Sequence, residues 1–173
     1  MARSLPKLDP SCYVGHKFIH WIFSVDERKS GWLTDLFHLR FREILLHICV
    51  RESLITPAYC LMPDHCHLLL VGLDGKSSQR AAVKLLRQEL NRLLAPGFTL
   101  QHQAYDHLLR TEESAAHAFP GVLTYIFNNP CRKSLSKTTL DWAFSGSLAP
   151  GFTVFDLRTD EGWKLWQKLS APL

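Results

Sequence analysis

The chain has 173 residues, of which 46% are hydrophobic and 21% charged, a composition typical of one folded domain and unlike that of disordered or membrane-spanning proteins. Its formal charge of +4 permits an anionic partner such as nucleic acid without requiring one. The five cysteines are scattered and form no C-x-x-C pair, so a disulfide framework is not expected.

No targeting or membrane segment is predicted. Residues 1–6 lack the apolar core of a signal peptide, and no apolar run approaches the roughly 18 residues of a membrane span. We therefore expect a soluble, cytoplasmic protein that makes no membrane contact. The length predicts a single domain over residues 1–173, with a core over about residues 13–135 and a C-terminal extension over residues 136–173.

The first elements predicted are a strand and a helix. Residues 13–25 are rich in β-branched and aromatic side chains and predict a strand on which His16 and His20 share one face. For these two histidines we expect a packing or substrate-side role in preference to metal binding. Apolar residues at helical spacing then predict an amphipathic helix over residues 34–51, with Thr34 as its cap.

The middle of the chain completes a recognisable order of elements. Residues 54–62 and 64–72 predict two strands joined by a tight turn, and Ser77 or Ser78 caps a second amphipathic helix. Residues 98–109 predict a fourth strand. The order β-α-β-β-α-β is that of an α+β, ferredoxin-like fold, in which an antiparallel sheet carries both helices on one face and leaves the other face free.

The last third of the chain predicts further helices and a packed tail. Residues 111–113 indicate one helix start, and Pro120 indicates the start of a C-terminal helix that carries Tyr125 and runs to about Asn129. The residues after position 137 are aromatic and rich in turn formers, so this short tail is expected to pack back onto the domain.

Two histidines flank one small apolar residue where the second strand of the hairpin begins. Side chains two apart on a strand leave by the same face, so His65 and His67 are expected side by side, about 7 Å apart along the backbone. A buried polar group without a partner costs roughly 1–3 kcal/mol, and a bound cation would satisfy both rings. The pair therefore indicates metal ligands, although two histidines hydrogen-bonded within a sheet would give the same pattern.

A second polar pair lies near the end of the predicted C-terminal helix. Positions four apart share a helix face, so Tyr125 and Asn129 are expected to point the same way, with Leu123, Ile126 and Phe127 turned elsewhere. A phenol and an amide oxygen would then meet. A tyrosine packed at a helix end, with the amide as its cap, would give the same pattern, because the following proline disfavours helix at the residue before it.

Three segments together resemble a known family. They are residues 62–69 (Met-Pro-Asp-His-Cys-His-Leu-Leu), 105–110 (Tyr-Asp-His-Leu-Leu-Arg) and 125–133 (Tyr-Ile-Phe-Asn-Asn-Pro-Cys-Arg-Lys). In order and spacing they resemble the single-tyrosine transposases of the histidine-hydrophobic-histidine nuclease superfamily, and among these the transposases associated with repetitive extragenic palindromes (REP). The chain departs from the family pattern at Asp64, where members often have Asn, and at Cys66, where Val is more frequent.

The resemblance implies a role for each matching residue. His65 and His67 become metal ligands, Asn129 a third ligand and Tyr125 the nucleophile. The ion implied is Mg²⁺ or Mn²⁺, although by ligand softness alone Zn²⁺ would also bind the histidines. The activity implied is that of a transposase, a metal-dependent endonuclease and strand transferase acting on single-stranded, hairpin or palindromic DNA through a 5′-phosphotyrosine intermediate, in DNA transposition and recombination.

Basic residues are the candidates for holding DNA phosphates. One group forms a stripe on a predicted helix, and the other lies beside the matching segments. The candidates are Arg80, Lys84 and Arg87 in the stripe, and Arg110, Arg132 and Lys133 beside the segments. A solvated helix face would give the same stripe.

Two other functions fit parts of the sequence. A domesticated DNA-hairpin-binding protein with little or no catalysis would keep the basic residues, but the intact candidate site argues against a loss of activity. A small metal-binding ferredoxin-like module would leave the segment around Tyr125 unexplained. The sequence leaves open whether the protein is a monomer or a homodimer, and whether one chain completes the active site.

Overall fold

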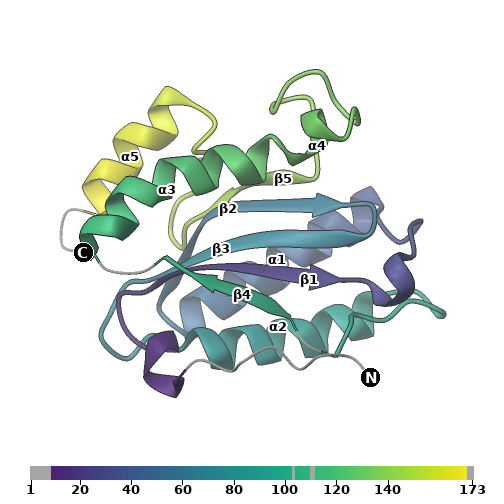
Figure 1. The fold of residues 1–173 in the computed structure, drawn as a ribbon, viewed down its shortest axis with the longest axis horizontal. Helices are drawn as coiled ribbons and strands as arrows, with labels where there is room; N and C mark the ends of the chain where they lie inside the picture. The colour runs from purple at the N-terminus through teal and green to yellow at the C-terminus, as the bar shows by residue number, and fades with distance from the viewer. Residues whose placement is uncertain (1–8, 103, 110–111, 171–173) are drawn as a thin grey trace.

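The computed structural model describes residues 9–102, 104–109 and 112–170, and within them five antiparallel strands form one sheet (Figure 1). The strands are β1 (Phe18–Ser24), β2 (Leu54–Met62), β3 (His65–Gly72), β4 (Tyr105–Leu108) and β5 (Ser145–Leu148). The α-helices are α1 (Asp35–Arg51), α2 (Gln79–Leu93), α3 (Glu112–Phe127), α4 (Asn129–Arg132) and α5 (Asp160–Ser170), and two short 3-10 helices are η1 (Pro10–Tyr13) and η2 (Asp26–Arg28).

The strand order β4-β1-β3-β2-β5 contains the predicted ferredoxin-like arrangement. Its first four strands, with α1 and α2 between them along the chain, follow the order β-α-β-β-α-β, which confirms the α+β fold class. The fifth strand was not predicted. It pairs with β2 at the edge of the sheet, and its sequence, Ser-Gly-Ser-Leu, lacks the alternating apolar residues by which strands are recognised.

Helices cover both faces of the sheet. One face packs against α1 and α2 around the larger apolar core, as predicted (Figure 1). The prediction that the other face is free was wrong, because α3 and α5 pack there around a second core that includes Phe119, Leu123 and Trp166. All nine residues of β2 are buried, so this strand requires apolar cover on both sides.

The first two α-helices begin at capping residues. The Phe37 N–H donates to Thr34 Oγ1 (3.1 Å), so α1 starts where the sequence predicts. The Ala81 N–H donates to Ser78 Oγ (3.3 Å), which identifies Ser78, and not Ser77, as the cap of α2.

The late helices differ from the prediction of two separate starts. A single helix, α3, runs through Pro120, and Thr111, which was predicted to precede it, lies outside the described residues. A proline inside a helix removes one hydrogen bond and costs about 3 kcal/mol. The buried side chains Phe119, Leu123 and Ile126 lie on both sides of the proline in the chain, so packing on the sheet holds the two halves as one helix.

Two predicted strands are shorter in the structure. The strand expected over residues 13–25 begins later, because η1 and a turn at Gly15, with a φ of 85°, occupy its first residues. The strand expected over residues 98–109 is confined to β4, and Leu100 makes only an isolated bridge to Val25.

The C-terminal extension packs on the domain, as predicted. Phe155, Leu157 and Trp166 are buried, and the indole N–H of Trp142 donates to the carbonyl oxygen of Leu61 (2.9 Å). None of the helices in the described ranges has both the length and the apolar character that a membrane crossing requires.

Gly72, at the end of β3, allows a close approach of two backbone segments. A Cβ added at this position would lie 1.9 Å from the carbonyl oxygen of Gly15, whereas a Cβ at Gly75 would meet nothing within 4 Å. We predict that Gly72→Ala lowers the free energy of unfolding, measured in urea titrations, by at least about 1 kcal/mol, because the backbone at Gly15 or Gly72 must move to make room for the methyl group. The matched Gly75→Ala substitution is expected to change it by less than about 0.5 kcal/mol, and equal effects would contradict this packing.

Candidate active site

The two histidines of β3 lie side by side on the face of the sheet that α3 covers. Their Nε2 atoms are 3.0 Å apart. Two neighbouring nitrogens around an octahedral ion, each bound at about 2.1 Å, would also be about 3.0 Å apart. The same distance suits a hydrogen bond between the rings when one of them carries the proton, so His65 and His67 form a pair that can exist with or without an ion.

The far nitrogen of each ring has a partner of its own. His65 Nδ1 lies 2.5 Å from Asp64 Oδ1, and His67 Nδ1 lies 3.0 Å from Nε2 of His20. Asp64 also accepts a hydrogen bond from the exposed side chain of Arg28 (3.2 Å). Partners of this kind orient the rings of metal-binding histidines and fix which nitrogen carries the proton.

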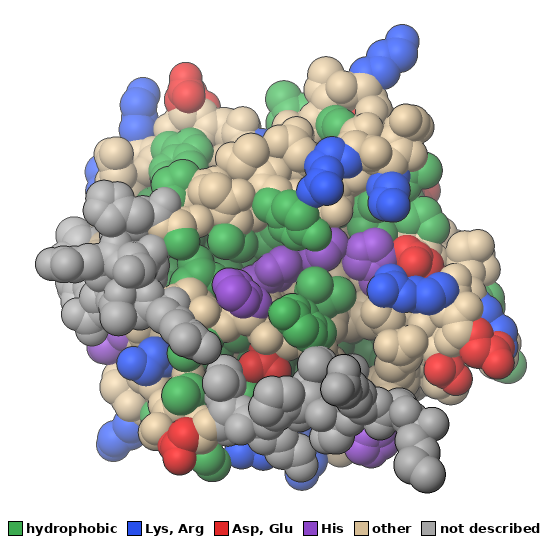
Figure 2. Space-filling model, in the orientation of Figure 1, with side chains coloured by type: hydrophobic (Ala, Val, Ile, Leu, Met, Phe, Trp, Pro, Cys, Tyr) green, Lys and Arg blue, Asp and Glu red, His purple; other side chains and the backbone are tan. Residues whose placement is uncertain are grey.

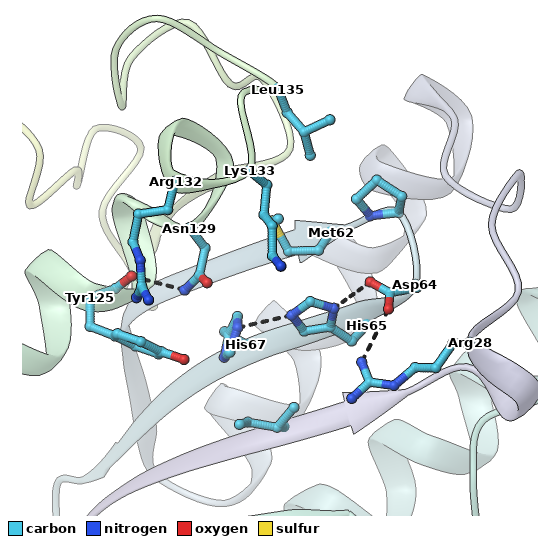
Figure 3. A pocket seen from close by; sticks show the side chains of 12 residues that line it. Arg28, Met62, Asp64, His65, His67, Tyr125, Asn129, Arg132, Lys133 and Leu135 are labelled. Carbon is cyan, nitrogen blue, oxygen red and sulfur yellow. Dashed lines mark hydrogen bonds and ion pairs between the residues drawn. The ribbon is translucent and has the colours of Figure 1, made fainter.

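Tyr125 lies over these rings within the same chain. Its ring centroid is 5.6 Å from that of His67 and 6.0 Å from that of His20, both in edge-to-face contact. Its neighbours Leu123 and Ile126 are buried against the sheet, whereas Tyr125 is 42% exposed, so the expected division of the helix faces is confirmed. Figure 3 shows the phenolic hydroxyl directed toward His67.

Asn129 is buried where α3 gives way to α4. Its Nδ2 donates to the carbonyl oxygen of Tyr125 (2.8 Å), so the amide does cap the end of α3. This bond uses only the amide nitrogen, so the amide oxygen can still act as an acceptor or ligand, and Asn129 lines the cavity. The capping role and a ligand role are therefore compatible in one side chain.

A cavity of about 720 Å³ brings most of these groups together (Figure 3). Its lining residues are Ile22, Arg28, Met62, Pro63, Asp64, His65, His67, Tyr125, Asn129, Arg132, Lys133 and Leu135. The guanidinium of Arg132 lies 5.2 Å from the centroid of the Tyr125 ring. Figure 2 shows histidine side chains in a row across this face, with lysine and arginine side chains near one end of the row.

The other predicted basic residues are not brought to the cavity. Arg80, Lys84 and Arg87 lie on α2, which packs on the opposite face of the sheet. The Arg80 guanidinium lies over the ring of Tyr13 (5.7 Å), and Arg87 donates to the carbonyl oxygen of Gln101 (3.0 Å). Arg110 lies outside the described residues.

Sequence reasoning did not predict the contacts of three residues at this site, although it expected a packing or substrate-side role for His20. His20 shares a strand face with His16, but nothing in the pattern indicates that it contacts His67. Asp64 belongs to the first matching segment, but no contact with His65 was predicted for it. Arg28 belongs to η2 and has a φ of 55°, a backbone conformation that no motif signals for an arginine.

His67 and His20 are held neutral, and Asp64 is held charged. Burial, with a smaller contribution from neighbouring positive charges, lowers the pKa of His67 to about 3 and that of His20 to about 4. Partial burial acts to raise the pKa of Asp64, but the hydrogen bond and charge of His65 and the charge of Arg28 outweigh it, so the pKa lies below its ordinary value. Neutral imidazoles are the form that binds metal ions.

The candidate donor set could hold a divalent ion that keeps open coordination positions. Within the part of the chain that the structure describes, no three His, Cys, Asp or Glu side chains are grouped to hold an ion. The candidate ligands are the two imidazoles of His65 and His67 and the amide oxygen of Asn129. Such a set leaves coordination positions open for water and for oxygen atoms of a bound molecule.

Comparison with known proteins identifies similar chains. The family described as transposase IS200 like matches residues 14–110, more than half of the chain, including both histidines of β3. A Haemophilus influenzae protein named as a REP-associated tyrosine transposase is 25% identical over 135 residues, which cover 70% of this chain and 74% of that protein. A solved structure of a REP-associated tyrosine transposase bound to a REP hairpin has the same fold, with a TM-score of 0.63 and 17% identity over 84% of this chain and 82% of that one.

The lowered pKa of His67 predicts a specific pH dependence of stability. Because its pKa falls from 6.5 to about 3 on folding, the unfolded chain binds more protons below pH 6.5, and the free energy of unfolding must fall as the pH drops through that range. In EDTA, we expect the loss between pH 7.5 and pH 5 to be about 1–2 kcal/mol smaller in His67→Gln than in the wild type. Urea titrations at both pH values measure it, and parallel losses in the two proteins would contradict the neutral, buried state of this ring.

Proposed function

Because this chain belongs to the IS200-like transposase family, we propose that it is a metal-dependent endonuclease and strand transferase of single-stranded, hairpin or palindromic DNA. One observation carries the proposal. The phenol of Tyr125 and the paired Nε2 atoms of His65 and His67 line the same cavity, and all three come from one chain. The substrate class is supported by the solved relative of this fold, which is bound to a REP hairpin.

Tyr125 is the nucleophile in this proposal. Its oxygen attacks the phosphorus of a phosphodiester, the bond from phosphorus to the 3′ oxygen breaks, and a 5′-phosphotyrosyl link forms. The phenol loses its proton, and the departing 3′ oxygen takes one up and becomes a free 3′-hydroxyl. A phosphotyrosyl bond keeps the energy of the original diester, so a second strand end can be joined without ATP, and cutting and rejoining are one reversible reaction.

A metal ion is the proposed cofactor, held by His65, His67 and Asn129. When bound, Mg²⁺ or Mn²⁺ would neutralise the charge that develops on the scissile phosphate and orient it for in-line attack. The protein's own contribution is to fix the ligands. Asp64 accepts a hydrogen bond from the Nδ1–H of His65. In the neutral ring, Nε2 of His65 then has its lone pair free to bind the ion.

Basic residues around the cavity are the proposed phosphate contacts. Arg28, Arg132 and Lys133 all line it, and each can offer a positive charge to a strand that enters beside Tyr125. Arg132 also lies against the Tyr125 ring, where its charge favours the negative charge that builds up during attack. The stripe on α2 belongs to the opposite face and is not included in this site.

The central test uses a labelled DNA hairpin with a single-stranded flank, in the presence of Mn²⁺. We predict a covalent protein-DNA adduct that survives denaturing electrophoresis, requires the ion, and falls at least about 10³-fold in Tyr125→Phe, because the nucleophilic oxygen is lost. Tyr105→Phe is the matched control, since Tyr105 is similarly exposed (47% against 42%) but lies on β4.

The outcomes of this test separate the possible functions. An adduct that persists in Tyr125→Phe would overturn the assignment of the nucleophile. Salt-sensitive hairpin binding with no adduct in the wild type would indicate a domesticated DNA-binding protein instead. If the wild type shows neither hairpin binding nor an adduct, the remaining hypothesis is a metal-binding module with no role in DNA processing.

DNA binding provides a second prediction that distinguishes the two basic groups. Lys133→Gln is expected to weaken hairpin binding and to lower the slope of log K against log salt by about 0.7–0.9, which is the contribution of one phosphate contact. Lys84→Gln, on the opposite face, is expected to leave both unchanged. Equal effects of the two substitutions in fluorescence anisotropy titrations would show that α2 also contacts the DNA.

A further inference from the structure

His67 lies between two other imidazoles, and both of its ring nitrogens are engaged. Its Nε2 is 3.0 Å from Nε2 of His65, and its Nδ1 is 3.0 Å from Nε2 of His20. His67 and His20 are 2% and 7% exposed, and their rings are stacked with centroids 5.1 Å apart. Solvent therefore has little access to this contact, and the hydrogen bonds must be satisfied by the rings themselves.

The positions of the protons in the ion-free protein follow from Asp64. A carboxylate only accepts hydrogen bonds, so Nδ1 of His65 carries a proton, and in the neutral ring, which is the form that binds a metal ion, its Nε2 then has a lone pair. The short contact between the two Nε2 atoms then requires a proton on Nε2 of His67. A neutral imidazole carries one N–H, so Nδ1 of His67 accepts, and Nε2 of His20 must donate to it.

Binding of an ion reverses this pattern. For His67 to present a lone pair from Nε2, its proton must sit on Nδ1, and Nε2 of His20 must then accept. We propose that His20 is a positioning residue that changes tautomer together with His67 and so presents the Nε2 lone pair of His67 to the metal ion. On each ring one proton moves from Nε2 to Nδ1, and neither ring changes charge. This inference rests on the proposed metal site.

The residue type at position 20 suits this role. Aspartate can only accept a hydrogen bond and lysine can only donate one, so neither could satisfy Nδ1 of His67 both with and without the ion. Histidine can do either by shifting its proton. A glutamine amide can also do either, by turning its oxygen or its nitrogen toward His67, whereas a phenyl ring keeps the contact with Tyr125 but offers no hydrogen bond.

The first experiment measures Mn²⁺ affinity of the full chain by electron paramagnetic resonance, without DNA. We expect His20→Phe to weaken binding about 10- to 100-fold, the usual effect of losing such an orienting partner, and His20→Gln to restore it to within about 3-fold of the wild type. His16→Phe is the control and is expected to change nothing. It removes an exposed imidazole whose one hydrogen bond to a described residue is with the Gly72 carbonyl oxygen.

The second experiment observes the tautomers directly in the wild-type protein, so it does not depend on any variant folding. Nitrogen-15 NMR of the imidazole rings is expected to show protonated Nε2 on His20 and His67 in EDTA, and protonated Nδ1 on both at saturating Mg²⁺. A His20 ring that keeps its Nε2 proton at saturation would overturn the proposal.

The outcomes also separate this inference from the proposed function. If the wild type binds Mn²⁺ and His20→Phe binds it equally well, the role of His20 is wrong and the metal site stands. If the wild type binds no Mn²⁺, the metal site and the role of His20 both fall.

Discussion

The alternation of side chains along β3 is the constraint on which the site depends. It sends Leu68 and Leu70 into the core under α1 and α2, and it sends His65 and His67 to the opposite face. That face is largely apolar, so an imidazole placed there must find polar partners. Asp64 and His20 are the partners of the two Nδ1 atoms, and the two Nε2 atoms meet each other at the cavity.

Packing of α3 on the same face supplies the second half of the site. Leu123 and Ile126 bury their side chains against the sheet, and helical geometry then turns Tyr125 toward the histidines. The helix ends immediately afterwards, where Asn129 caps it and lines the cavity. Packing of the apolar side chains of α3 on the sheet thus fixes the position of the Tyr125 phenol.

Local patterns predicted much of the fold. The hairpin, both early helices and their order were evident because alternation, helical spacing and capping residues act over a few positions. The features that failed depend on contacts between distant segments. β5 is a strand because it pairs with the edge of β2. α3 passes through Pro120 because its apolar side chains pack on the sheet. α3 and α5 also cover a face of the sheet that was expected to be free.

The same distinction applies to the site. His65, His67 and Tyr125 could be selected from the sequence because each belongs to a short segment with a familiar spacing. His20 could not, because its contact with His67 depends on the register of β1 against β3, in which Ile22 is the residue opposite His67. Arg28 reaches the cavity through a backbone conformation with positive φ and through its ion pair with Asp64. Neither feature can be predicted from a local sequence pattern.

A crystal structure of the full chain grown with Mn²⁺ tests the central claim most directly. The anomalous signal of manganese is expected at a single strong peak bound by Nε2 of both β3 histidines, with the phenol of Tyr125 from the same chain facing the ion. A manganese peak elsewhere would contradict the account. So would a Tyr125 side chain that faces away from the ion, if Tyr125 of a neighbouring chain does not face the ion in its place.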